Sequence, residues 1–149
     1  MTPAVKIFFL FAILAVILGA ARFLAPKSAS PQIVINGQTI LVEIADTPEK
    51  IVQGLSEREK LAENWGLLFV FKQAGDYTFW MKDMKFDLDF VFINGDTVVD
   101  LSENIPHPDQ GQEPQTVNAA EPIDKALEIN AGQIKKLGLK IGDIIKLTL

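Results

Sequence analysis

Hydrophobic positions along the chain follow two different patterns. Near the amino terminus they form one unbroken run, residues 7–21 (IFFLFAILAVILGAA), which contains no charged side chain. After residue 31 they occur as short runs that Gly, Pro, Asn and Asp interrupt. The first pattern is typical of a membrane-directed helix, and the second of short strands joined by turns. The chain therefore divides into a leader and a globular part.

The leader is long enough to cross a membrane only if the spanning helix includes the charged residues on either side of the apolar run. The uninterrupted run would span about 22 Å as a helix, whereas residues 4–25 would span about 33 Å if Lys6 and Arg22 reach the two interfaces. We predict that residues 1–25 form an uncleaved hydrophobic helix that anchors the protein in the membrane. A cleaved signal peptide is the alternative, because the length of the run suits one. Both place the domain outside the cytoplasm, behind a linker at residues 26–31.

Two turn sequences predict hairpins in the globular part. Residues 36–37 are Asn-Gly, the preferred pair for a type I′ turn, and runs of β-branched residues flank them. Residues 94–96 (Asn-Gly-Asp) separate the apolar runs 88–93 and 97–101 in the same way. Each pair of runs is therefore expected to form two antiparallel strands.

Two short helices are also predicted. Thr47 can cap a helix in which Pro48 is the first residue, and this helix is expected to end within residues 56–60. A second helix is expected over residues 133–137, because Gly138 follows its last apolar position. Both helices are too short to dominate the fold.

The remaining elements complete a mainly β fold. Further strands are predicted at residues 66–71, 77–81, 125–129 and 144–149, and a long loop at residues 105–115. Hairpins dominate and βαβ alternation does not run through the chain. We therefore predict an α+β domain over residues 32–149, mainly β with two short helices, built on a curved, mostly antiparallel sheet or small β-barrel.

Charge and composition narrow the chemistry. Only Lys6 and Arg22 of the 14 basic residues precede Lys27, and none of the 19 acidic residues precedes Glu43, so residues 26–149 have 12 basic and 19 acidic residues, a net charge of −7. Such a domain repels phosphate backbones, and we expect no nucleic-acid partner. The absence of cysteine excludes disulfides and thiol catalysis, and the single histidine excludes multi-histidine metal sites. We expect neither a metal nor a cofactor.

Several segments of the globular part together resemble a known family. They are Thr47-Pro48, Gly54-Leu55, Arg58, residues 66–71 (GLLFVF), residues 79–82 (FWMK), Leu88-Asp89, residues 127–132 (LEINAG) and Gly142-Asp143. In this order they resemble DUF192 (UPF0127), a family of uncharacterised bacterial and archaeal proteins, over residues 33–149. The resemblance implies a compact β-rich fold, often behind a signal or anchor, and no established reaction. Ser56 and Asp83-Met84 depart from the family pattern, which has Met and Asn-Thr there.

Residues 86–93 alternate between two faces of an expected strand. The phenylalanines fall on one face, and Asp87 and Asp89 fall on the other. One interpretation is a polar site in which Asp89, with Asp83 or Asp87, binds a cation or a sugar hydroxyl. The other is structural, with Asp89 capping a turn or pairing with Lys82.

Two further residues are candidates for binding. If Phe79 and Met81 point into the core, Trp80 points outward, where it can stack on a sugar ring or a partner surface. Packing of Trp80 under the proline-containing loop is the alternative. Asn130 precedes the second helix and is a candidate cap, beside amides that could receive an anion.

These observations lead to a binding domain as the first hypothesis. We expect a non-catalytic binding or accessory module at the outer face of the membrane, with a carbohydrate or protein ligand near Trp80, Lys82, Asp83, Asp89 and Asn130. The alternative is a hydrolase of envelope polymers that uses Asp89 with Glu43 or Asp83 as paired carboxylates. A module that needs a metal for its stability is a third possibility. Of these, only the carboxylate pair would make the domain an enzyme.

Overall fold

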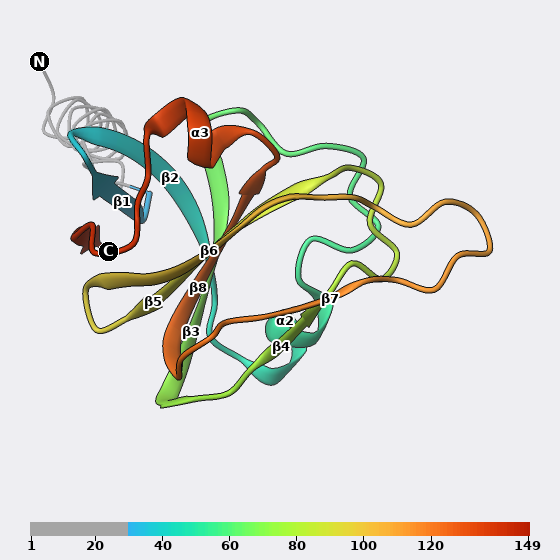
Figure 1. Cartoon of the computed structure of the whole chain (residues 1–149), viewed down its shortest axis with the longest axis horizontal. Coiled ribbons are helices and arrows are strands. Elements are labelled where there is room, and N and C mark those ends of the chain that lie inside the picture. Colours follow the sequence, from blue (N-terminus) through green and yellow to red (C-terminus); the bar gives the residue numbers. More distant parts are fainter. Residues whose placement is uncertain (1–29) are drawn as a thin grey trace, which may run out of the picture.

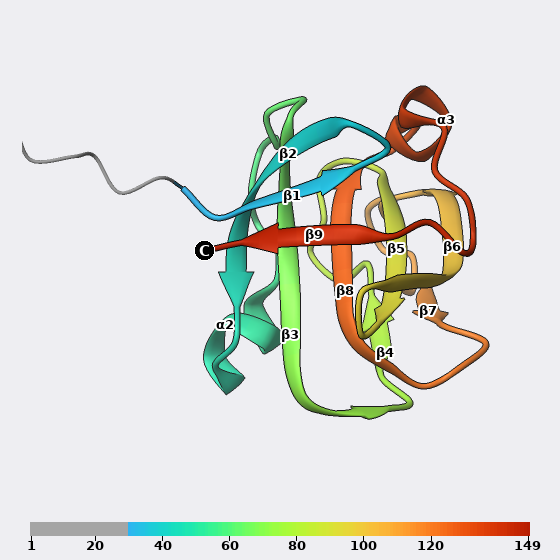
Figure 2. The same cartoon turned by 90° about the vertical axis from the view of Figure 1, so that its left-hand side faces the viewer.

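The fold is built on one curled sheet of seven strands (Figures 1 and 2). The computed structural model describes residues 30–149, so the predicted anchor and most of the linker lie outside the described residues. The strand order is β6-β5-β8-β3-β2-β1-β9, and β4 and β7 form a separate two-stranded ribbon. The elements are β1 Gln32–Ile35, β2 Gln38–Ala45, α2 Pro48–Gln53, β3 Trp65–Gly75, β4 Thr78–Trp80, β5 Leu88–Asn94, β6 Thr97–Ile105, β7 Thr116–Asn118, β8 Ile123–Asn130, α3 Gln133–Leu137 and β9 Ile145–Thr148. The mainly β class with two short helices is therefore confirmed for this part of the chain.

Both predicted hairpins are present. β1 and β2 pair antiparallel around Asn36 and Gly37, which have φ of 49° and 74°, as a type I′ turn requires. β5 and β6 pair up to Asn94 and Thr97. Local turn chemistry was enough to predict these two contacts because each joins neighbours in sequence.

A parallel strand pair interrupts the otherwise antiparallel sheet. β2 and β3 run parallel, and α2 lies in the connection between them. Thr47 caps α2 and Pro48 is its first residue, as predicted. The helix ends at Gln53, earlier than predicted, because Gly54 with φ of 53° turns the chain toward the next strand.

Each face of the sheet buries its own hydrophobic core. The α3 core, beside α3, β1 and β9, consists of Ile33, Ile35, Ile40, Val42, Leu68, Val91, Ile93, Val98, Leu127, Ile129, Ile134, Leu139 and Ile145. The α2 core, on the opposite face beneath α2 and β4, consists of Ala45, Leu55, Leu67, Phe69, Phe79, Met81, Met84, Leu88, Phe90, Phe92, Val117, Ile123 and Ala126. Figure 1 shows the two sets of covering elements on opposite sides of the sheet. The alternation predicted for β5 is confirmed, since Phe90 and Phe92 face the α2 core, and Val91 and Ile93 the α3 core.

The β4–β7 ribbon covers the α2 core. Phe79 and Met81 are buried under it, whereas Trp80 between them is 48% exposed, as their alternation requires. β7 falls just after the segment predicted to be a loop, and β6 extends to Ile105. Within residues 30–149, neither short helix nor any other has the length and hydrophobicity of a membrane span.

Candidate functional site

The site centres on a buried carboxyl group in the middle of the sheet. Glu128 lies on β8 directly opposite Leu67 of β3 and Phe90 of β5, so its side chain points toward the α2 core. Only 5% of the residue is exposed. Within residues 30–149, no hydrogen-bond donor reaches its Oε2 atom. A buried polar atom without a partner costs free energy, so this carboxyl group needs an explanation beyond folding.

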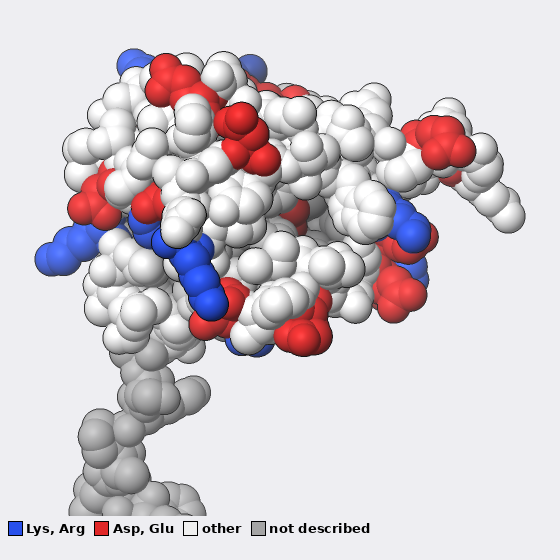
Figure 3. Space-filling model, turned by 90° about the horizontal axis from the view of Figure 1, so that it is seen from below, with Lys and Arg blue, Asp and Glu red and all other residues white. Residues whose placement is uncertain are grey.

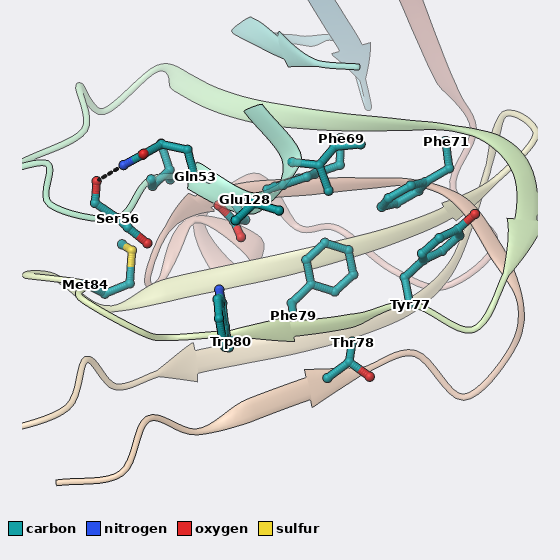
Figure 4. Close-up of a pocket in the computed structure, with 14 residues that line it drawn as sticks. Gln53, Ser56, Phe69, Phe71, Tyr77, Thr78, Phe79, Trp80, Met84 and Glu128 are labelled. Carbon is teal, nitrogen blue, oxygen red and sulfur yellow. Dashed lines mark hydrogen bonds between the residues drawn. The ribbon is translucent and has the colours of Figure 1, made fainter. Parts of the chain in front are cut away.

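A cavity of about 90 Å³ lies next to this carboxyl group. It is formed where the end of α2 and the turn after it meet β3 and β4, and Figure 4 shows the Glu128 carboxyl between Trp80, Phe79 and Gln53. The lining residues are Ile51, Val52, Gln53, Gly54, Leu55, Ser56, Phe69, Phe71, Tyr77, Thr78, Phe79, Trp80, Met84 and Glu128. The cavity is therefore mainly apolar, with one acid in its wall.

Aromatic rings form much of the wall. Phe71 and Tyr77 stack with their ring centres 3.6 Å apart, and Phe79 packs edge-on against Phe69 at 5.3 Å. At the rim, Trp80 and Val52 are 48% and 67% exposed. These are two of the five large hydrophobic side chains that the described chain leaves exposed. Their position at one opening indicates a contact surface and not a random scatter.

Burial dominates the electrostatics of the site. Removal from water raises the pKa of Glu128 to about 8, although the nearby Arg58 guanidinium lowers it in part. Arg58 is itself engaged, since it donates two hydrogen bonds of 2.7 and 2.8 Å to the carboxylate of Glu43. This bidentate pair holds the pKa of Glu43 below its usual value. Glu128 thus stays protonated near neutral pH, whereas Glu43 is ionised.

Asp89 lies on the opposite face of the sheet from Glu128. It is fully buried, and its two carboxylate oxygens accept hydrogen bonds from the backbone N–H groups of Asn104, at 2.7 Å, and Ile134, at 2.8 Å. The second bond caps the start of α3, because Gly132 at the cap position has no side chain to do so. Its contacts therefore match the structural interpretation of a cap, although Lys82 is not the partner.

The other predicted site residues are spread over three places. The Lys82 ammonium lies 5.2 Å from the ring centre of Trp80, at the rim of the cavity. Asp83 has a positive φ of 56°, and its backbone carbonyl accepts a bond from the Glu57 N–H. Asn130 does not cap α3. Its amide donates to the backbone carbonyls of Leu61 and Ala62.

Glu43 and Asp89, one of the two carboxylate pairs proposed for hydrolysis, point to opposite faces of the sheet. Glu43 is in register with Leu67, on the α2 face, whereas Asp89 points to α3. Asp87 instead pairs with His107, which lies 2.6 Å from it through Nδ1. In the part of the chain that the structure describes, no cluster of three potential metal ligands occurs.

Sequence reasoning missed Glu128 as a site residue. Its stretch, Ala126-Leu127-Glu128-Ile129, is buried throughout. A lone acid with apolar neighbours on both sides in a predicted strand was the available signal, since acids are rarely buried without a partner. The facing residues from β3, β4 and α2 could not be assigned without the fold.

The comparisons with known proteins agree with this architecture. The fold places the chain among mainly β domains built on a curled half-barrel sheet. The chain belongs to the DUF192 family, described as "Uncharacterized ACR", whose model matches residues 32–147. The family resemblance is therefore confirmed.

Two crystal structures are similar to this chain. One is of a protein from Sinorhizobium meliloti 1021, provisionally described as a transcription regulator, with 31% identity, a TM-score of 0.69 and coverage of 83% of this chain and 98% of its own. The other is of a protein of unknown function from Novosphingobium aromaticivorans DSM 12444, with 28% identity, a TM-score of 0.70 and coverage of 82% and 89%. No curated protein matches the chain.

Proposed function

We propose that this protein is a membrane-anchored module that binds a ligand outside the cytoplasm and does not transform it. One group of the ligand would enter the cavity beneath Trp80 and reach Glu128, and this group would belong to a cell-envelope carbohydrate or to a protein partner. The leader sequence supports the location, because a hydrophobic run of this kind directs a chain to the membrane. The cavity supports the binding role.

The buried acid is the observation that carries the proposal. Glu128 Oε2 has no partner among the described residues, and its carboxyl group lies in the wall of an open, aromatic-lined cavity. A hydrophobic residue in its place would remove the cost of burying the acid. A ligand that supplies the missing partner explains why an acid occupies this position.

The surface around the opening also supports binding. Figure 3 views the molecule from below, the side on which Figure 1 places α2 and β4. The centre of this face is mainly uncharged, and acidic and basic side chains lie around it. An apolar area with a polar margin is the usual composition of a contact surface.

The same cavity argues for binding over hydrolysis. Among the described residues that line it, Glu128 is the only acid. Glycoside hydrolysis ordinarily needs a second carboxyl group on the other side of the scissile bond. Glu43 cannot readily supply it while it is held by Arg58.

A binding experiment on the full chain tests the proposal. The protein is kept in a polyoxyethylene detergent, which carries neither charge nor sugar, and titrated with envelope saccharides and with short peptides. We expect at least one compound to shift the NMR signal of the Trp80 indole N–H. Trp80→Ala should weaken that binding, whereas Trp65→Phe should not, because Trp65 does not line this cavity. If no compound shifts signals around the cavity, the proposed function is wrong.

A separate experiment tests the location. The mature protein is recovered from membranes, and its amino terminus is sequenced. Retention of residues 1–25 in the membrane fraction is expected. A soluble protein that begins near residues 25–31 would show that the leader is a cleaved signal.

A further inference from the structure

We propose that the cavity beside Glu128 is a receptor for an unbranched primary alkylammonium group, such as the end of a lysine side chain or of a free amine. This inference rests on the proposed binding function and specifies its ligand. It combines three observations: the size of the cavity, the aromatic wall, and the acid in that wall.

The volume of the cavity excludes a ring as the part of the ligand that enters it. The cavity measures about 90 Å³. An apolar cavity that holds benzene measures about 150 Å³ in another protein, so a sugar ring or an aromatic ring is too large to enter fully. A chain of a few carbon atoms with a terminal nitrogen fits. The exposed Val52 and Trp80 at the rim would then cover the part of the ligand that remains outside.

The wall favours a positive charge. The faces of aromatic rings attract cations, and Phe71, Tyr77, Phe79 and Trp80 all line the cavity. Trp80 already shows this preference, because the Lys82 ammonium lies 5.2 Å from its ring centre. An ammonium group also supplies the hydrogen-bond donors that Glu128 Oε2 lacks within the described chain. An anionic ligand would be repelled both by the negative faces of the aromatic rings and by the Glu128 carboxylate.

The other charged groups near Glu128 leave room for a cation. The Arg58 guanidinium lowers the pKa of Glu128, and its charge is partly offset by the Glu43 carboxylate, to which it donates two hydrogen bonds. Tyr77 is the other titratable residue in the cavity wall. Lys82 at the rim is a further cation, and its charge would oppose that of an ammonium ligand bound beside Trp80. Removal of Lys82 should therefore strengthen binding.

The proton of Glu128 links binding to pH. The buried acid is protonated below pH about 8, and an ammonium ligand pairs best with the ionised form. Binding should therefore release a proton near neutral pH, and affinity should rise as the pH approaches 8. A neutral ligand that accepts or shares the proton would show no such rise.

The test compares n-butylammonium with n-butanol and butyrate, which match it in size but differ in charge. The full chain is titrated in the polyoxyethylene detergent, and the Trp80 indole signal and the Glu128 carboxyl carbon are followed by NMR. We expect n-butylammonium to bind at least ~30-fold more tightly than n-butanol, the factor that follows from ~2 kcal/mol for a buried charge pair. Glu128→Gln should remove this preference, and Glu121→Gln, at an exposed acid, should leave it unchanged.

A second variant keeps the test valid if Glu128→Gln does not fold. Trp80 is half exposed, so Trp80→Ala should fold, and it should weaken n-butylammonium binding by about 3-fold to 30-fold through the lost ring face. Lys82→Met should strengthen the same binding. Tighter binding of n-butylammonium to Trp80→Ala, or weaker binding to Lys82→Met, would overturn the proposal.

Lysine derivatives identify the source of the ammonium group. Nα-acetyl-lysine methylamide that binds more tightly than n-butylammonium would support a polypeptide partner, and equal or weaker binding would support a free amine. Acetylation of the Nζ atom of the lysine derivative removes its positive charge and should abolish its binding, whichever source is correct. If n-butanol or butyrate binds as tightly as n-butylammonium, or if a saccharide shifts the cavity signals while no amine does, the ammonium proposal is wrong. Either of these results would leave the proposed binding function standing. That function is wrong only if none of the compounds shifts the NMR signals of residues around the cavity.

Discussion

The strongest consequence of a buried acid is a dependence of stability on pH. Glu128 has its pKa raised from 4.5 to about 8 in the folded protein, because burial penalises its charged form. The folded state therefore keeps a proton that the unfolded state releases above pH 4.5. The contribution of Glu128 to stability is most favourable below pH 4.5 and is lost progressively as the pH rises toward 8. Above pH 8, Glu128 is ionised in both the folded and the unfolded state, and the loss of stability does not increase further.

The magnitude follows from the two pKa values. A difference of about 3.5 between them corresponds to about 5 kcal/mol over the whole range, at 1.36 kcal/mol for each pKa unit. Between pH 5 and pH 8 the loss is about 3 to 4 kcal/mol, which is a large part of the stability of an ordinary domain. Glu128→Gln removes the titration and retains the shape of the side chain. Its buried amide carries a cost of its own, so the change with pH is the informative quantity.

The assay is urea unfolding of the wild-type chain and of Glu128→Gln at several pH values from 5 to 8, followed by far-UV circular dichroism. We expect the variant to gain stability relative to the wild type by about 1 kcal/mol for each pH unit. Other titrating groups are common to both proteins and cancel in the difference. Glu121→Gln serves as the control at an exposed acid. If the profiles of wild type and Glu128→Gln stay parallel within about 1 kcal/mol, Glu128 is not held protonated by burial.

Three further changes test other parts of the structure. Asp89→Asn places an amide N–H group against two backbone N–H donors, and it should lower the free energy of unfolding by about 2–4 kcal/mol in urea. The ligand-induced NMR shifts at the cavity should not change. If stability does not change either, Asp89 is not the cap of α3. Gly66→Ala should cost about 3 kcal/mol in the same assay, because the added Cβ would come within 2.7 Å of Leu127 Cδ1 and 2.9 Å of the Glu128 carbonyl oxygen. Arg58→Gln should raise the pKa of Glu128 further, since Arg58 lowers it, and a fall in the NMR titration midpoint would refute that coupling.

The elements that sequence predicted well are those that neighbouring residues specify. The turn at Asn36 and Gly37 and the capped start of α2 at Thr47 and Pro48 depend on a few adjacent residues, whose conformational preferences are strong enough to act alone. The alternation in β5 likewise follows from the two faces of a strand. The resemblance to DUF192 depended on motifs in order along the chain, and the family match over residues 32–147 confirms it.

Predictions failed where residues far apart in sequence decide the outcome. Asn130 looked like a cap because it precedes α3, but Asp89, 45 residues from Ile134, takes that role after β5 and β8 pair. The parallel pairing of β2 with β3 was not predicted, because the two runs carry no local signal of their relative direction. Lys82 was a candidate partner of Asp89, but the folded chain places its ammonium group 5.2 Å from the ring centre of Trp80.

The sequence by itself determined the mainly β class, the turns and the outward position of Trp80, whereas the membrane anchor at residues 1–25 stays a prediction. Only the tertiary structure showed that Glu128 is buried and that the end of α2, β3 and β4 close a cavity around it. The physical reason is that a turn or cap depends on short-range conformational energy, whereas the pKa and contacts of a side chain depend on what the folded chain packs around it. A lone acid between apolar residues can be exposed or buried, and strand pairing decides which.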